Sequence, residues 1–308
     1  MSARLIMPLM VLLAGCATQA PQAPSARPDP GFGVLVMAHG GGPQWNQEVL
    51  AAVEPLKDDY NVAVAFGMAD AASMQESVSQ LEARGARRIG VVRLFISGES
   101  FKERTEQILG VIPGAPAKSA NAADAHAGHG EGHGGHHRME FWKLDTQASF
   151  VLSEQGLVEA PEMGAVLATR AQALSKDPAR EDVLVIAHGP GDDAENERWL
   201  KHLDARAEVV RKALPFHAVR VDTLREDWPD KRVEAEKRIR AFVEQAAREG
   251  RRALVIPFRV QGFGPYAKVL DGLDYVSDGR GLIPHPSVTE WIEHQIETLR
   301  PTSMRAAR

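Results

Sequence analysis

The chain has 308 residues, 44% of them hydrophobic, and a formal net charge of −5. This length can hold two domains that each bury a core. With 36 basic against 41 acidic side chains, the chain lacks the basic excess typical of nucleic-acid-binding proteins, so we expect no nucleic-acid partner. The single cysteine, Cys16, excludes an intrachain disulfide framework.

The first sixteen residues have the pattern of a secretory signal. Arg4 precedes an apolar run over 5–13 that is too short to span a bilayer, and small residues follow. The order Leu13-Ala14-Gly15-Cys16 resembles the bacterial lipobox, which implies cleavage before Cys16 and acylation of its thiol. Residues 16–30, rich in Pro and Ala, would then be a tether. We expect an exported protein, lipid-anchored at the periplasmic face of a bacterial envelope. An N-terminal helix or strand buried in the fold is the less favoured alternative.

A buried strand that ends in His-Gly occurs twice. The apolar run Val34–Ala38 predicts a strand covered on both faces, as in parallel sheets, and it is followed by His39 and three glycines. The same phrase returns at Val183–Ala187, followed by His188 and Gly189. Because open α/β sheets bind ligands at the carboxyl ends of their strands, the two phrases predict a duplicated domain with sites around His39 and His188.

Strand and helix patterns alternate through both halves. Capping-box spacing over Ser73–Glu76 predicts the start of one helix. This alternation predicts an α/β fold of two tandem lobes, each a parallel sheet flanked by helices. The expected strands are 34–38, 61–66, 89–96, 183–187, 217–221 and 253–260, and the expected helices are 45–56, 73–84, one from 101, 194–214 and 231–249.

The two halves differ by one insertion. Gly98 pairs with Gly262 at an offset of 164, whereas Phe150-Val151 pairs with Tyr275-Val276 at an offset of 125, so the first half carries 39 extra residues, at about 110–148. The expected organisation is a signal peptide at 1–15, an acylated Cys and linker at 16–30, lobes at 31–175 and 181–300, and a tail at 301–308.

The insert is rich in Ala, Gly and His. Its imidazoles are good ligands for divalent transition metals, and a Gly-rich chain can bring several of them to one ion. A solvated low-complexity loop that binds metal incidentally is the alternative. The accessory metal ligands predicted here are His126, His129, His133, His136 and His137.

His39 and Glu99 face each other across the predicted sheet edge. An imidazole and a carboxylate with open positions are a plausible half-set of ligands for an exchangeable divalent metal. His39 could instead hold its turn, and Glu99 could instead satisfy the dipole of the helix from Phe101. No Gly-x-Ser-x-Gly elbow, Walker loop or dinucleotide fingerprint occurs, so we expect no nucleotide cofactor.

Several segments together resemble the class II chelatases, the sirohydrochlorin cobalto- and ferrochelatases of cobalamin and siroheme synthesis. They are Val34–Gly40, Ser73–Val78, Leu81–Ile96, Ile283–Pro286 and Trp291-Ile292. The resemblance implies two flavodoxin-like lobes facing a cleft where a tetrapyrrole meets a divalent metal (Co²⁺, Fe²⁺ or Ni²⁺), without a nucleotide. It also implies a monomer that contains both lobes.

Site residues follow by position from this resemblance. His39 would be the first metal ligand and the proton acceptor. The second family histidine is replaced by Glu99, which would be the other catalytic residue and metal ligand. His188 matches the first ligand in the second lobe, where Phe263 occupies the position of the second and offers none.

The function implied is insertion of a divalent metal into a sirohydrochlorin-type tetrapyrrole. The alternative is an exported, lipid-anchored metal-binding protein or metallochaperone on a degenerate chelatase fold. An exported α/β domain with another role is the third. A cleft in which His39, Glu99 and His188 converge would favour the first.

If Cys16 is the lipidated residue, Cys16→Ser should accumulate as unprocessed, unlipidated precursor, because the thiol is the acceptor of the lipid. Mass spectrometry of the purified chain measures this. A Cys16→Ser protein with the mass of normally processed wild type would contradict the anchor.

Overall fold

The computed structural model describes residues 29, 31–118 and 139–306. The strands are β1 (Phe32–Ala38), β2 (Asn61–Phe66), β3 (Arg88–Leu94), β4 (Ser149–Leu152), β5 (Glu181–Ala187), β6 (Ala218–Thr223), β7 (Arg252–Phe258) and β8 (Arg305–Ala306). The helices are α1 (Pro43–Val53), α2 (Ala71–Ala83), α3 (Lys102–Ile108), α4 (Met163–Leu174), α5 (Asp193–Ala213), α6 (Pro229–Arg248), α7 (Tyr266–Val269) and α8 (Pro286–Leu299), with 3₁₀ turns at Glu54–Leu56 and Pro178–Arg180.

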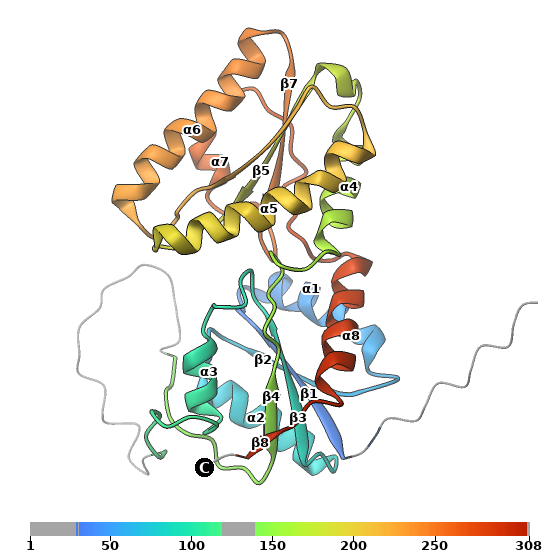
Figure 1. Ribbon diagram of the computed structural model, residues 1–308, viewed down its shortest axis with the longest axis vertical. Coiled ribbons are helices and arrows are strands. Elements are labelled where there is room, and N and C mark those ends of the chain that lie inside the picture. The colour runs from blue at the N-terminus through green and yellow to red at the C-terminus, as the bar shows by residue number, and fades with distance from the viewer. Residues whose placement is uncertain (1–28, 30, 119–138, 307–308) are drawn as a thin grey trace, which may run out of the picture.

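Two α/β lobes lie one above the other along the long axis of the molecule (Figure 1). The lower sheet has the strand order β2-β1-β3-β4-β8 and the upper sheet β6-β5-β7. Neighbouring strands are parallel, except that β8 runs antiparallel to β4 and returns the C-terminal end to the lower lobe. The predicted α/β class with two lobes is confirmed.

Backbone hydrogen bonds repeat between the halves at the predicted offsets. In the lower lobe the segment after β4 donates two N–H groups to the carbonyls that follow β3, and in the upper lobe the matching segments form the same pair. These bonds are Leu157 to Phe95 (2.9 Å), Val158 to Ile96 (2.8 Å), Leu282 to Arg259 (2.8 Å) and Ile283 to Val260 (2.9 Å). Donors differ by 125 residues and acceptors by 164, which confirms the duplication and the size of the insertion.

The last helix of each half packs against the lobe built by the other half. Helix α4 of the first half packs on α5 and β7, and α8 of the second half packs on α1 and β3 (Figure 1). The expected chain division near residues 175–181 therefore does not separate the two packing units. Removing either half of the chain would therefore expose an apolar face of the other lobe.

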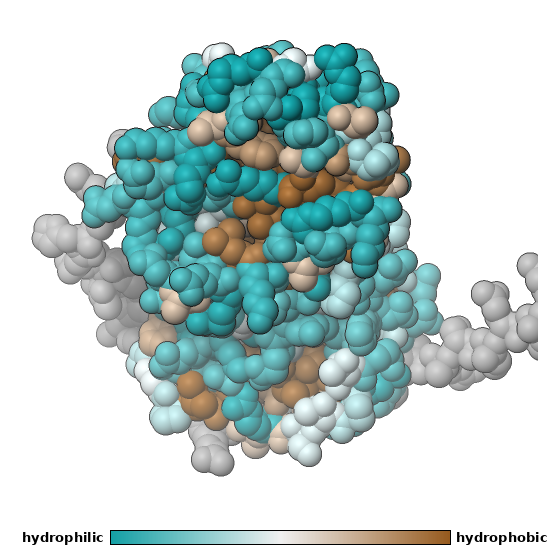
Figure 2. Space-filling model, turned by 45° about the horizontal axis from the view of Figure 1, so that its top comes forward, coloured by the Kyte–Doolittle hydropathy of each residue, from teal (hydrophilic) through white to brown (hydrophobic). Residues whose placement is uncertain are grey.

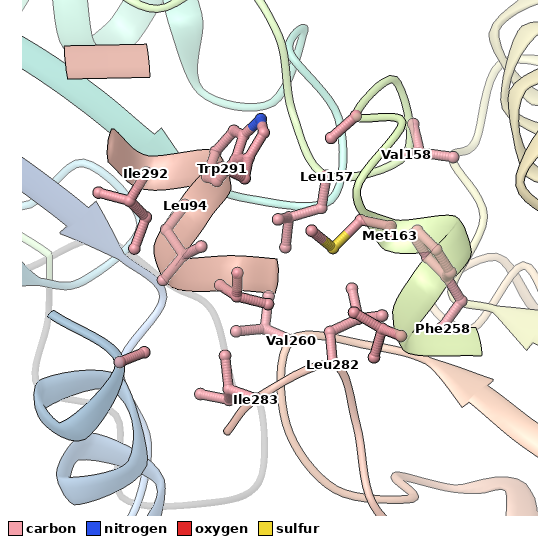
Figure 3. Packing of buried hydrophobic residues seen from close by; sticks show 14 of the residues in the cluster. Leu94, Leu157, Val158, Met163, Phe258, Val260, Leu282, Ile283, Trp291 and Ile292 are labelled. Carbon is pink, nitrogen blue, oxygen red and sulfur yellow. The ribbon is translucent and has the colours of Figure 1, made fainter. Parts of the chain in front are cut away.

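This exchange makes one continuous core between the lobes. In β1, Val34 and Val36 face that core, while Leu35 and Met37 face the outer layer of the lower lobe, as period-two alternation requires. Figure 3 shows the junction, where Trp291 of α8 lies near Met163 of α4 among aliphatic side chains. Apolar side chains on the surface gather in a few hollows of a largely hydrophilic face (Figure 2).

Helix α2 begins at Ala71, two residues earlier than the sequence pattern predicted. Its N-cap is Asp70, whose carboxylate accepts the N–H of Ser73 at 2.9 Å. The predicted start at Ser73 is wrong, because Asp70 precedes it by three residues and is the better-placed acceptor. Among the described residues, no helix is long and apolar enough to cross a membrane.

The loop after β3 depends on the small size of Gly98. A Cβ there would lie 1.9 Å from the carbonyl oxygen of Glu154, whereas a Cβ at Gly42 would meet nothing within 4 Å. We expect Gly98→Ala to lower the free energy of unfolding by about 2 kcal/mol, because backbone atoms must move apart. Gly42→Ala, the matched control, should stay within about 0.5 kcal/mol of wild type. Urea denaturation measures both, and equal values for the two variants would contradict the close approach.

Candidate functional site

A cleft of about 550 Å³ opens between the lobes, at the carboxyl ends of β1, β3, β5 and β7. This volume lies within the range of small-molecule sites. His39, Glu99 and His188 all line it, as the sequence predicted for a shared cleft. Its walls also carry five large aromatic side chains contributed by both lobes: Trp45, Phe95, Phe101, Trp199 and Trp228.

His39 stands exposed where β1 ends. Its Nδ1 lies 2.8 Å from the carbonyl oxygen of Gly40. A carbonyl only accepts, so Nδ1 carries the proton and Nε2 of the neutral ring keeps its lone pair. Within the described part of the chain, Nε2 has no hydrogen-bond partner. His39 is therefore exposed and available to a ligand, and it does not hold a buried turn.

His188 begins the matching loop of the upper lobe, which is braced by Arg225. The guanidinium of Arg225 donates to the carbonyls of Pro190 and Gly191. The backbone N–H of Arg225 donates to the carbonyl oxygen of His188 at 2.7 Å. Gly189 has φ +78°, and a Cβ there would lie 2.6 Å from the Cβ of Thr223. This loop is thus fixed before any ligand arrives.

Both nitrogens of His188 already have acceptors. Nδ1 lies 2.7 Å from the carbonyl oxygen of Gly189, and Nε2 lies 3.0 Å from the carboxylate of Asp227. Asp227 thus occupies the position that a metal would need at Nε2 of His188. The two halves place equivalent histidines in one cleft, but only His39 is free to act as a base or ligand in this geometry.

Glu99 forms an ion pair with Arg198 of α5. Three contacts of 2.9–3.0 Å join the guanidinium to both carboxylate oxygens. This bidentate pair links the loop after β3 to the upper lobe. The alternative that Glu99 satisfies the start of α3 is not what the structure shows, since the N-cap position is Phe101 and has no side-chain cap.

Glu195, one turn before Arg198 on α5, is a cleft residue that the sequence reasoning missed. Its carboxylate accepts the indole N–H of Trp199 at 3.2 Å. Burial raises the pKa of Glu195, and the charge of Glu99 raises it further. Its position within a long polar helix gave no signal, because only the fold brings α5 opposite the loop after β3.

The glycines beside the two histidines make room for tryptophans. A Cβ at Gly41 would lie 2.9 Å from Trp45, and one at Gly191 would lie 2.2 Å from Trp228. At these two positions an indole ring fills the space beside the glycine, so that space is not open to a ligand. Trp228 also meets His188 edge-on at 5.9 Å between ring centroids.

Arg93, Arg259 and Lys268 are basic residues at or near the ends of strands in the two sheets, where a side chain could pair with a ligand carboxylate or be an ordinary surface charge. Arg93 is neither, since it is 1% exposed and donates to the carbonyls of Ser153, Gly98 and Ser100. Arg259 lines the cleft and pairs with Glu226. Lys268 belongs to α7 and is not among the cleft residues.

The predicted ligand set is not preassembled. In residues 29, 31–118 and 139–306, no three His, Cys, Asp or Glu side chains lie close enough together to hold a metal ion. His39, Glu99 and His188 share the cleft walls, but Arg198 and Asp227 occupy two of them. Phe263 does not line the cleft; its ring stacks on Tyr275 at 6.0 Å.

The remaining predicted residues lie outside the described part of the chain. They are Cys16 and the histidines of the insert, His126, His129, His133, His136 and His137. Their roles stay predictions.

No protein-family profile matches the chain, and no curated protein matches its sequence. Solved structures do match its fold. SirB from Bacillus subtilis with Fe³⁺ has a TM-score of 0.55 and 14% identity, over 86% of this chain and 94% of that one. The sirohydrochlorin chelatase SirB from Bacillus subtilis subspecies spizizenii, in complex with cobalt, has a TM-score of 0.53 and 12% identity, over the same shares. The chain therefore has a class II chelatase-like fold.

The raised pKa of Glu195 gives a prediction for stability. The folded chain holds the Glu195 proton to higher pH than the unfolded chain, so ionising Glu195 costs stability as the pH rises above the ordinary value of about 4.3. We expect Glu195→Gln to be more stable than wild type at pH 7, and this gain to vanish at about pH 4, below the ordinary value, where the wild-type carboxyl is already protonated. Thermal unfolding across this range measures it. A gain that is independent of pH would contradict the assignment.

Proposed function

We propose that this chain inserts a divalent metal, cobalt or iron and alternatively nickel, into a sirohydrochlorin-type tetrapyrrole bound in the interlobe cleft. The observation that carries the proposal is the cleft itself, where the free Nε2 of His39 faces a space walled by aromatic rings. Flat conjugated ligands stack on such rings. The fold shared with SirB supports the same activity.

The chemistry needs a base beside the incoming metal. Insertion of a divalent metal bonds it to the four ring nitrogens and releases two N–H protons to bases or to water, so charge is balanced. A neutral imidazole can accept one of these protons, and the Nδ1–H bond to Gly40 orients His39 for that role. Glu99 is the second proposed catalytic residue and metal ligand, once its carboxylate is released from Arg198.

The metal is the substrate in this proposal, and no nucleotide takes part. Trp45, Trp199 and Trp228 would flank the macrocycle, and Arg259 could balance one of its carboxylates at the cleft wall. We further propose that the protein acts as an exported, lipid-anchored monomer; the N-terminal pattern through Cys16 supports the anchor.

A metal-binding or metallochaperone role is the second candidate. It needs only an available metal ligand, such as the Nε2 of His39, which has no hydrogen-bond partner among the described residues. The two functions differ in outcome, because a chaperone binds Co²⁺ without metallating the ring.

Incubation with Co²⁺ and sirohydrochlorin, followed by absorbance, tests the proposal. Wild type should accelerate metallation, and His39→Ala should lower the rate by about 100-fold, because the proton acceptor is lost. His188→Ala should cost less, since Asp227 already occupies its Nε2. His39→Ala should barely change thermal stability, because the ring is exposed.

His294→Ala is the matched control. His294 is an exposed histidine on α8 outside the cleft, paired with Glu162. This variant should metallate like wild type. No acceleration by wild type, or equal losses in His39→Ala and His188→Ala, would contradict the assignment of His39.

A further inference from the structure

The ion pair between Arg198 and Glu99 crosses the cleft from one lobe to the other. Both side chains are about half exposed, at 50% and 55%. Within the described residues, every hydrogen bond of the Arg198 guanidinium goes to Glu99. Glu99 is therefore the one hydrogen-bond partner of this guanidinium, which a flexible side chain carries at a half-exposed position. Arg198 can move away from Glu99 without losing any other hydrogen bond of its guanidinium.

Arg198 neutralises a concentration of negative charge. Glu195 lies one turn before Arg198 on α5 and lines the same cleft as Glu99. If Arg198 swings away, the carboxylate of Glu99 is released into the cleft that His39 also lines. A carboxylate and an imidazole are ligands suited to a divalent transition metal.

We propose that Arg198 is a positioning residue that competes with the divalent metal for Glu99 and is drawn away by a carboxylated ligand. This inference rests on the proposed function and adds an order of binding to it. A guanidinium pairs preferentially with carboxylates, to which it can donate two hydrogen bonds. A carboxylate of a polycarboxylate macrocycle can therefore replace Glu99 as the partner of Arg198. Glu99 then binds the metal more tightly when the macrocycle is present than when it is absent.

The competition predicts opposite effects of one substitution on the two ligands. Arg198→Gln should lower the Kd for Co²⁺ alone about fivefold, the upper range for an exposed ion pair. It should raise the Kd for sirohydrochlorin alone, because a cationic partner for its carboxylates is lost. Calorimetry measures the first value, and quenching of tryptophan fluorescence measures the second, since three tryptophans line the cleft.

A double-mutant cycle shows whether the gain passes through Glu99. In the Glu99→Gln background, Arg198→Gln should give no gain in Co²⁺ affinity. Arg198→Lys should fall between wild type and Arg198→Gln, because an ammonium pairs without the bidentate fork. Arg206→Gln is the control for a general interlobe effect: Arg206 lies on the same helix and donates to the carbonyl of Glu159 at 2.7 Å. It should leave both Kd values unchanged.

An unchanged Kd for Co²⁺ in Arg198→Gln would overturn the competition. Weaker binding of both ligands would mean that Arg198 only holds the lobes together, and would overturn it too. Neither measurement uses turnover, so failure of the proposed function is seen separately: the binding pattern can hold in a chain that metallates no ring.

Discussion

The hydrophobic core shared between the lobes is the constraint on which the cleft depends. Helices α4 and α8 each leave the half that encodes them and cover the sheet of the other half. Trp291, fully buried on α8, lies in the same core as Met163 of α4 and Phe258 of β7. Separating the lobes would expose this apolar surface, which costs about 25 cal/mol per Å². The lobes are thus held face to face with the carboxyl ends of their central strands meeting at one cleft.

Duplication supplied two similar loops, and the side chains around them made their roles differ. In both loops a histidine Nδ1 bonds the carbonyl of the next glycine. Asp227 then takes the second nitrogen of His188, while that of His39 stays free. The two histidines differ in the availability of Nε2, because a carboxylate lies beside that of His188 only. A pseudo-symmetric fold therefore presents an asymmetric site.

The charges of the cleft are balanced in pairs. Arg198 meets Glu99, and Arg259 meets Glu226. Burial alone would lower the pKa of the Arg259 guanidinium, but Tyr266 and Glu226 raise it above its ordinary value. The Arg198–Glu99 pair is about half exposed and contributes little to stability, whereas the Arg259–Glu226 pair is largely buried.

The sequence by itself determined six of the eight strands among the described residues, the duplication and the sheet edge where the cleft opens; β4 and β8 were not expected. Five consecutive apolar residues at Val34–Ala38 predict a strand buried on both faces, and the two offsets between the halves return as matching backbone hydrogen bonds. These features depend on short-range pattern and chain order. Their prediction did not require knowing which residues far apart in the sequence come into contact.

Only the tertiary structure decided the partners of the charged side chains. Glu99 meets Arg198 across 99 residues of chain, and the burial of Arg93 depends on carbonyls from two loops. The exchange of α4 and α8 was equally invisible, because an amphipathic helix shows that it has a buried face and not which sheet covers it. Periodicity records how a segment is buried, whereas pairing depends on where the whole chain places each segment in space.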